Sequence, residues 1–319
     1  MRGSSILLAN IVEVSVMKKM KVLYLLLGVI LFILLFGATM LQQNSRSHLN
    51  NDINQDSKKN KPQRIVSMSP GNTEILFALG AGARVVGVSS YSDYPDEAKN
   101  KPIIGSYNSP DVEKIVALAP DIVFAMGQTQ ASYIHVLEQA GIHVVATEPQ
   151  NLSEILTSID IISAAIGEEE HGAALNAELT GKIDAVRQLT ANSQPKRVFM
   201  EIWDAPLLTV GSRSFINDII NQAGGINVAG NKNVYYTPCD VEMLYAYNPE
   251  IYIVVSHSRK DIRSYVTQAE LRDITAVKNE QVFPILDDLL TRPGPRSFDG
   301  LIELAKILHP EEMKSWEAK

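Results

Sequence analysis

The chain contains one segment twice, and this internal repeat constrains its fold more than any other feature. Residues 109–124 and residues 237–253 match at six positions in one register. A unit that occurs once in each half of a chain indicates two related lobes, whereas a solenoid repeats a short unit many times. Two lobes in turn create a cleft between them. The identical pairs are Asp111 and Asp240, Val112 and Val241, Glu113 and Glu242, Ala117 and Ala246, Pro120 and Pro249, and Ile122 and Ile251.

Each copy predicts a helix start, a short helix and then a strand. Ser109 and Thr237 are predicted to cap the two helices, because a hydroxyl at the N-cap can accept a hydrogen bond from a free backbone N–H. A proline follows each, which suits the first turn, and acidic residues come near the positive end of the helix dipole. A second proline is predicted to end each helix before a β-branched strand. Each lobe therefore carries one glutamate, Glu113 or Glu242, at the same place on the same helix.

Composition excludes several classes of protein. A chain of 319 residues accommodates two domains of ordinary size. Its net charge of −7 argues against nucleic-acid binding, which requires a basic surface. Cys239 is the single cysteine, so neither an intramolecular disulfide nor a paired-cysteine zinc site is possible. The six histidines are scattered, and no metal or cofactor site is predicted.

The N-terminal part has the pattern of a membrane segment. Residues 22–41 are uncharged and almost wholly apolar, and about 20 such residues can cross a bilayer as a helix. Basic residues precede this run, so residues 1–21 are predicted to be cytoplasmic and the globular part to lie outside. Residues 42–61 are polar and predict a flexible tether. No cysteine follows the run directly, which argues against a lipid anchor; an uncleaved anchor is favoured, with a cleaved signal sequence as the alternative.

After the tether, short β-branched strands alternate with helices, a pattern typical of parallel βαβ units. An N-terminal lobe is predicted for residues 62–167 and a C-terminal lobe for residues 193–319. Residues 153–192 are predicted to be helical, with residues 168–192 as the candidate connecting helix. The predicted fold class is α/β, with two Rossmann-like lobes and mainly parallel sheets.

Four sequence strings identify a family resemblance. They are RIVSMSPGNTE at 64–74, SSYSDYP at 89–95, EKIVALAPD at 113–121 and RPGPR at 292–296. Through them the chain closely resembles the substrate-binding proteins of vitamin B12 ABC importers, within a wider family that also binds iron-siderophores and haem. The resemblance spans about residues 63–310. It implies two α/β lobes joined by a single long rigid helix, with the ligand held in the cleft between them.

The resemblance also implies a ligand site walled by flat or polarizable side chains, which suit a large macrocycle. Tyr91 matches a corrin-contacting tyrosine, whereas Tyr107, Tyr236 and Met126 occupy positions where the family has tryptophans. The predicted ligand-binding set, which includes a polar pair near the ligand's edge, is Tyr91, Tyr107, Met126, Tyr236, Asp288 and Arg292.

Transport partners follow from the same resemblance. One glutamate on each lobe of the family's members docks onto arginines of the membrane permease, and Glu113 and Glu242 match these two positions. The implied partners are the permease and ATPase of an ABC importer, with a corrinoid as ligand and the protein as a monomer. Tyr235 and Cys239 border the same loop as Tyr236, but neither is assigned to the site.

Other functions remain as alternatives. An iron-siderophore or haem could use similar aromatic walls, although an anionic siderophore usually requires several convergent arginines. Arg292 and Arg296 are the clear candidates for that role. An enzyme is not expected, because the sequence shows no Ser-His-Asp set, nucleophile elbow, metal cluster or paired acids. A signalling receptor is not expected either, since residues 1–21 are too few for an output domain.

Overall fold

The N-terminal lobe is built on four parallel strands, in the order β2-β1-β3-β4 across the sheet. The computed structural model describes residues 61–256 and 269–316 of the chain. The β-branched runs of the first half form β1 (Ile65–Ser67), β2 (Val85–Val88), β3 (Ile122–Met126) and β4 (Val144–Thr147). Between them lie the helical segments α2 (Pro70–Ala78), η1 (Gly82–Arg84), η2 (Asp96–Asn100), α3 (Val112–Ala117) and α4 (Ala131–Gln139).

The C-terminal lobe has a mixed sheet in the order β10-β9-β5-β6-β8, and β7 also pairs with β5. Parallel pairing joins β5 to β7 and β9, and β9 to β10, whereas β6 pairs antiparallel with both β5 and β8. These strands are β5 (Lys196–Asp204), β6 (Leu207–Val210), β7 (Gly225–Asn227), β8 (Tyr236–Pro238), β9 (Ile251–Ser256) and β10 (Val282–Leu286). The helical segments are α7 (Phe215–Gln222), α8 (Val241–Tyr247), α10 (Thr275–Lys278), α11 (Asp288–Thr291), α12 (Ser297–Leu308) and η3 (Glu312–Trp316).

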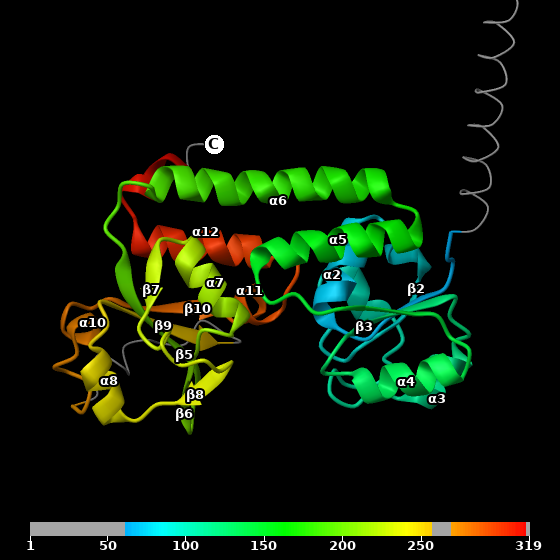
Figure 1. The fold of residues 1–319 in the computed structure, drawn as a ribbon, viewed down its shortest axis with the longest axis horizontal. Coiled ribbons are helices and arrows are strands. Elements are labelled where there is room, and N and C mark those ends of the chain that lie inside the picture. Colours follow the sequence, from blue (N-terminus) through cyan, green and yellow to red (C-terminus); the bar gives the residue numbers. More distant parts are fainter. Residues whose placement is uncertain (1–60, 257–268, 317–319) are drawn as a thin grey trace, which may run out of the picture. The chain divides into compact units, whose positions relative to one another are not determined.

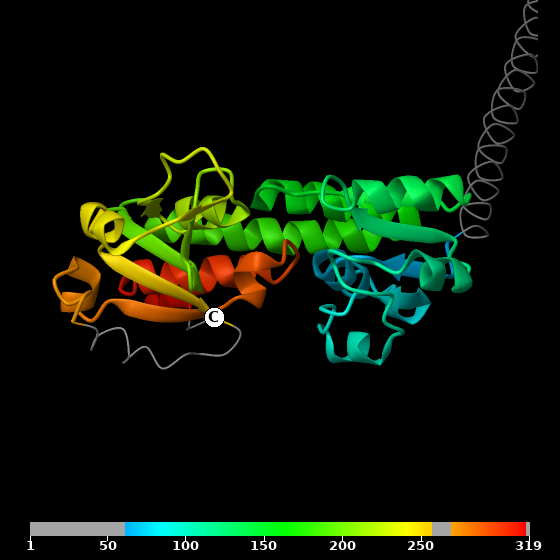
Figure 2. The ribbon, with the colours of Figure 1, turned by 90° about the horizontal axis from the view of Figure 1, so that it is seen from below.

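The predicted long helix is α6 (Glu169–Thr190), which lies along both lobes (Figures 1 and 2). The prediction of helix over residues 153–192 is wrong in one respect, because the segment forms two helices. The first, α5 (Leu152–Ile166), ends before α6 begins. Gly167 adopts the left-handed conformation with φ of 71°, which a glycine tolerates without steric cost. The break turns the chain so that α6 packs back against α5.

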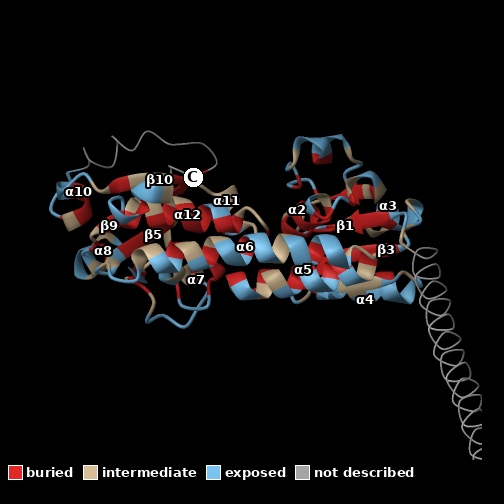
Figure 3. Cartoon of the chain, turned by 90° about the horizontal axis from the view of Figure 1, so that it is seen from above, coloured by how far each residue is buried: buried red, intermediate tan, exposed pale blue. Residues whose placement is uncertain are grey.

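One hydrophobic core continues through both lobes beneath α6. Ile65 and Phe124 of the first sheet belong to the same cluster of buried side chains as Ile159 of α5 and Phe298 of α12. Viewed from above, α6 presents a largely exposed outer surface (Figure 3). Each buried side chain of this size contributes about 1.5–3 kcal/mol. Separating the lobes would therefore expose apolar surface, which favours a cleft of nearly fixed width.

The two copies of the repeat form α3 with β3 and α8 with β9, but their caps differ from prediction. Asp111 accepts a hydrogen bond from the N–H of Lys114, and Asp240 accepts one from the N–H of Met243. Ser109 and Thr237 do not cap these helices. The chain is still extended at the intervening prolines, which form a bridge to Gly105 in one copy and the end of β8 in the other. The helices consequently begin after the aspartates, which are their N-cap residues.

The ends of these helices are also equivalent. Ala119 and Asn248, which directly precede the prolines predicted to stop the helices, both have positive φ, of 43° and 38°. Arg64 donates to the carbonyl of Leu118 at 2.6 Å from Nη2, and Arg197 donates to the corresponding carbonyl in the other lobe. In each lobe, an arginine at the start of the first strand, β1 or β5, thus satisfies a free carbonyl at the end of α3 or α8.

The predicted membrane segment, residues 22–41, lies outside the described residues. Among residues 61–256 and 269–316, no helix has the length and apolar character needed to span a bilayer.

Candidate functional site

A cavity of about 650 Å³ lies between the lobes and is bordered by loops that follow the strands of both sheets. Tyr91 follows β2, Gln128 follows β3, Glu148 follows β4 and Arg292 comes after β10. The carboxyl ends of parallel strands are the usual place for ligands in open α/β sheets, because the connecting loops diverge there. The volume is within the range typical of small-molecule sites.

Aromatic and soft apolar side chains wall this cavity, and they come from both lobes. Tyr91, Tyr107 and Met126 of the N-terminal lobe line it together with Tyr236 of the C-terminal lobe. Tyr91 is 60% exposed and Tyr236 is 49% exposed, which leaves their rings available to a ligand. Partial desolvation in the cleft raises the pKa of the Tyr236 hydroxyl, and the nearby Tyr107 adds to the rise.

Tyr107 is held from behind by a buried amide that the sequence did not single out. The Nε2 atom of Gln130 donates to the carbonyl of Tyr107 at 2.8 Å and to that of Met68 at 2.9 Å. Its Oε1 atom accepts from the N–H of Met126 at 2.9 Å. Gln130 therefore joins the ends of β1 and β3 to the loop that carries Tyr107. Gln130 comes shortly after the buried strand β3, at the carboxyl end of the sheet where ligand sites form. That position in the sequence is the signal that could have identified it.

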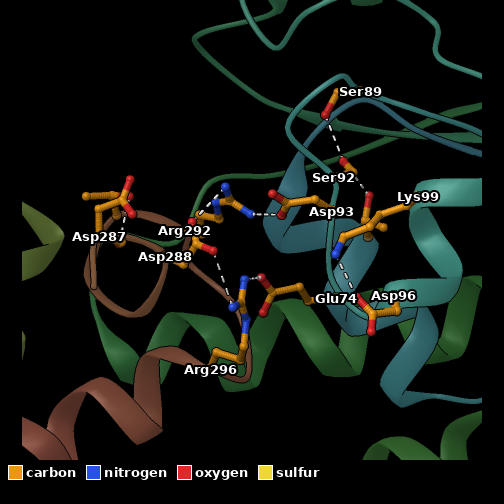
Figure 4. A network of polar contacts seen from close by, with 12 residues as sticks. Glu74, Ser89, Ser92, Asp93, Asp96, Lys99, Asp287, Asp288, Arg292 and Arg296 are labelled. Carbon is orange, nitrogen blue, oxygen red and sulfur yellow. Dashed lines mark hydrogen bonds and ion pairs between the residues drawn. The ribbon is translucent and has the colours of Figure 1, made fainter. Parts of the chain in front are cut away.

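The two members of the predicted polar pair, Asp288 and Arg292, contact each other, but only one of them borders the cavity. Arg292 lines the cavity, whereas Asp288 does not border it. Asp288 instead lies behind the wall, where its Oδ1 atom pairs with Nη2 of Arg292 at 2.7 Å and its Oδ2 atom with Nη1 of Arg296 at 3.5 Å. Arg292 also pairs with Asp93 of the other lobe, as Figure 4 shows.

A second ion pair crosses between the lobes below the first. The Nη2 atom of Arg296 lies 2.6 Å from Oε1 of Glu74, a residue of α2 that is only 3% exposed (Figure 4). The guanidinium also stacks 4.1 Å from the ring centroid of Tyr94. Burial raises the pKa of Glu74, and the opposing effect of Arg296 does not cancel this rise.

The backbones of the two lobes approach closely beside these pairs. A Cβ atom on Gly71 would come within 2.1 Å of the carbonyl oxygen of Pro293, so only glycine fits there. The RPGPR segment and the start of α2 are therefore packed directly against each other. This contact and the two ion pairs form one side of the cleft.

Part of the remaining wall is polar and was not predicted. Gln128, Glu148, Gln150 and Ser214 line the cavity. Tyr235, which the sequence left unassigned, lines it as well. Most of these residues lie in loops after strand ends, but single polar residues in loops carry no pattern from which a site can be predicted.

Cys239 does not line the cavity, and the residue is only 6% exposed. Burial raises its pKa to about 11, with the neighbouring Asp240 adding to the shift. Because the thiolate is the reactive form of cysteine, this residue is a packing residue. Within the described ranges, no group of three His, Cys, Asp or Glu residues is arranged to hold a metal ion.

Glu113 and Glu242 are exposed on the first turns of α3 and α8. Figure 1 places these two short helices on the same side of the molecule, opposite α6. The matched glutamates thus occupy equivalent places on the two lobes.

Two α/β lobes with a ligand-sized cavity at their strand ends, walled from both sides, define a two-lobed solute-binding protein. The family model described as periplasmic binding protein matches residues 65–289, and the chain belongs to this family. It is therefore an extracytoplasmic substrate-binding protein and not an enzyme.

Individual relatives agree on the fold and differ in ligand. The "uncharacterized ABC transporter substrate-binding lipoprotein YvrC" of Bacillus subtilis is 32% identical over 82% of this chain and 85% of its own length. The structure of the periplasmic vitamin B12 binding protein BtuF of Vibrio cholerae matches with a TM-score of 0.70 at 27% identity, over 80% of this chain and 99% of that one. The periplasmic heme-binding protein RhuT from Roseiflexus sp. RS-1 matches with a TM-score of 0.69 at 28% identity, over 78% and 99%. The predicted family and fold are confirmed.

Proposed function

We propose that the protein captures cobalamin or a related corrinoid in the cleft between its lobes. The observation that carries this proposal is the wall of tyrosines, with Tyr91 and Tyr107 on one lobe and Tyr236 on the other, around one cavity. Aromatic faces give a large planar macrocycle extensive apolar contact while their hydroxyls stay available for hydrogen bonds. A relative from Vibrio cholerae that is 27% identical carries the name vitamin B12-binding protein, which supports the same ligand class.

Haem and iron-siderophores are the competing ligands, and several relatives of known structure are named for haem. An anionic ligand of either kind calls for cationic side chains that are not already neutralised. Arg292 borders the cavity, but Asp93 and Asp288 both pair with it. Arg296 is likewise paired with Glu74 and Asp288. The neutralised arginines favour a corrinoid over an anionic iron chelate.

The partner in this proposal is an ABC importer composed of a permease and an ATPase. Glu113 and Glu242 would each meet one permease subunit, one lobe to each. Residues 22–41 would anchor the monomeric protein to the extracytoplasmic face of the cell membrane. The relative YvrC, named as a substrate-binding lipoprotein of an ABC transporter, supports both the partner and the location.

Calorimetry with the purified full-length protein tests the ligand. Cyanocobalamin, cobinamide, haem and a set of ferric siderophores would be titrated separately. We expect one-to-one binding of the two corrinoids. Heat from an iron chelate or haem alone would reject the corrinoid and leave the family and fold unchanged.

A further inference from the structure

A second cavity, of about 530 Å³, shares part of its wall with the tyrosine-lined cavity and extends the cleft. Gln128, Glu148 and Tyr235 border both cavities. Whereas the first cavity is walled by aromatic rings, the second is walled mainly by side-chain amides and hydroxyls. The amide residues are Gln128, Gln150, Asn151, Asn217 and Asn221. We call this second cavity the polar annex.

The charges that border the polar annex do not leave a surplus of positive charge. Arg213 is the one cationic side chain in its wall, and its guanidinium stacks 4.6 Å from the centroid of the Tyr235 ring. It also donates to the Tyr235 hydroxyl at 3.2 Å. Two carboxylates, Glu148 and Asp218, border the same annex. A ligand group that enters it therefore meets more negative than positive charge.

Glu148 is fixed at the junction between the two cavities. It follows β4, and one of its carboxylate oxygens, Oε2, accepts a hydrogen bond from the backbone N–H of Gln128. Glu148 also lines the tyrosine-walled cavity together with Tyr107. Within the described residues, no lysine, arginine or histidine forms an ion pair with it. The second oxygen, Oε1, is thus available to a donor from a ligand.

This arrangement distinguishes two kinds of macrocycle by their edges. A primary carboxamide on the ligand can donate its N–H to the Glu148 carboxylate, a charge-assisted hydrogen bond. Its carbonyl can accept from the amides of the polar annex. A carboxylate at the same place would be repelled, because two like charges would meet in a partly desolvated cleft.

We propose that the polar annex selects a macrocycle edged by uncharged carboxamides, and that Glu148 is the residue that rejects one edged by carboxylates. The inference rests on the proposed function and goes further, because it names the part of the ligand that is read and the residue that reads it. It accounts for a preference for corrinoids, which carry carboxamides, over haem, which carries two propionates.

The test compares cyanocobalamin with its monocarboxylic acids, in which one carboxamide is hydrolysed. Calorimetry would use the full-length wild-type protein, Glu148→Gln and a matched control, Glu170→Gln. The glutamine in Glu148→Gln keeps an oxygen that can accept from Gln128, while Glu170 is exposed on the first turn of α6. We expect at least one acid isomer to bind wild type roughly tenfold more weakly than the amide. Glu148→Gln should remove most of that preference and tighten haem binding, whereas Glu170→Gln should change neither.

Salt provides an independent measurement on wild-type protein alone. Raising the ionic strength should narrow the difference between amide and acid, because repulsion between charges is screened. If corrinoids bind but the preference survives both Glu148→Gln and added salt, the assignment of Glu148 is wrong and the proposed function stands. If no corrinoid binds, the proposed function fails together with this inference.

Discussion

Arg296 and Glu74 lie 222 positions apart in the sequence, and their side chains form a 2.6 Å ion pair that joins the two lobes. The pair is almost completely shielded from solvent, since the Glu74 side chain is 2% exposed and that of Arg296 is 16% exposed. Removing the Glu74 charge leaves the Arg296 guanidinium with Asp288, 3.5 Å away, as its remaining ion-pair partner in a medium of low dielectric constant. The pair therefore holds the two lobes together beside the cleft and contributes to the stability of the fold.

Glu74→Gln should destabilise the protein by about 3 kcal/mol, the scale observed when one partner of a buried ion pair is removed. The measurement is urea-induced unfolding monitored by circular dichroism. Replacing both partners, as Glu74→Leu with Arg296→Leu, should cost less than Glu74→Gln, because no charge is then left uncompensated. A double variant that is as unstable as the sum of two single variants would contradict this account.

The sequence predicted those parts of the molecule that follow from local pattern. A glycine just past a helix is a common C-terminal signal, and Gly80 closes α2 in the left-handed conformation with φ of 74°. The repeat predicted α3, α8 and their glutamates. The pairing of Arg296 with Glu74 carries no such pattern, because it depends on how two lobes meet. The antiparallel pairings of β6 and the polar wall around Glu148 were missed for the same reason.

The tyrosine wall makes a second prediction. Tyr107→Ala and Tyr236→Ala should each weaken ligand binding by about 1–3 kcal/mol, the scale of losing a buried aromatic contact. Calorimetry with cyanocobalamin measures the loss, and the melting temperature without ligand should scarcely change. Tyr245→Ala, on α8 and away from the cavity, is the matched control. Normal binding by both cleft variants would show that these rings do not contact the ligand.

The cap of α3 makes a prediction about pH. The hydrogen bond from the N–H of Lys114 lowers the pKa of Asp111. A lowered pKa in the folded state means that the cap contributes stability above the unfolded pKa, about 3.9, and loses it as the pH falls through the folded value. Asp111→Asn keeps the cap but does not titrate, so its stability relative to wild type should rise as the pH is lowered. Ser109→Ala should leave stability unchanged at every pH. A large effect of Ser109→Ala on stability would show that Ser109 caps the helix after all.

The anchor prediction concerns residues 22–41. Full-length protein should stay in the membrane fraction after carbonate and high-salt washes, since an uncharged run of this length can span the bilayer. Deleting residues 1–44 should release a soluble protein that still binds ligand. A mature N-terminus between Thr39 and Ser45, found by sequencing secreted protein, would identify the run as a cleaved signal instead.

The matched glutamates make the last prediction. If Glu113 and Glu242 dock on the permease, Glu113→Lys with Glu242→Lys should abolish ligand-dependent stimulation of transport. Fold and ligand affinity should be unchanged, because both side chains are exposed and neither lines the cavity. Each single reversal should weaken stimulation in part, with a larger effect at low salt, where charges act over a longer range.

Transport by a reconstituted importer measures this effect, and the control reverses the same number of charges on the opposite side of the molecule. Glu170→Lys with Glu178→Lys, both on α6, should transport as wild type does, since Figure 1 places α6 away from α3 and α8. Single surface ion pairs are worth only about 0–1 kcal/mol. The double reversal is decisive because it replaces attraction with repulsion at both lobes at once. If that variant transports as wild type does, the repeated glutamates only stabilise the first turn of each helix and do not dock on the permease.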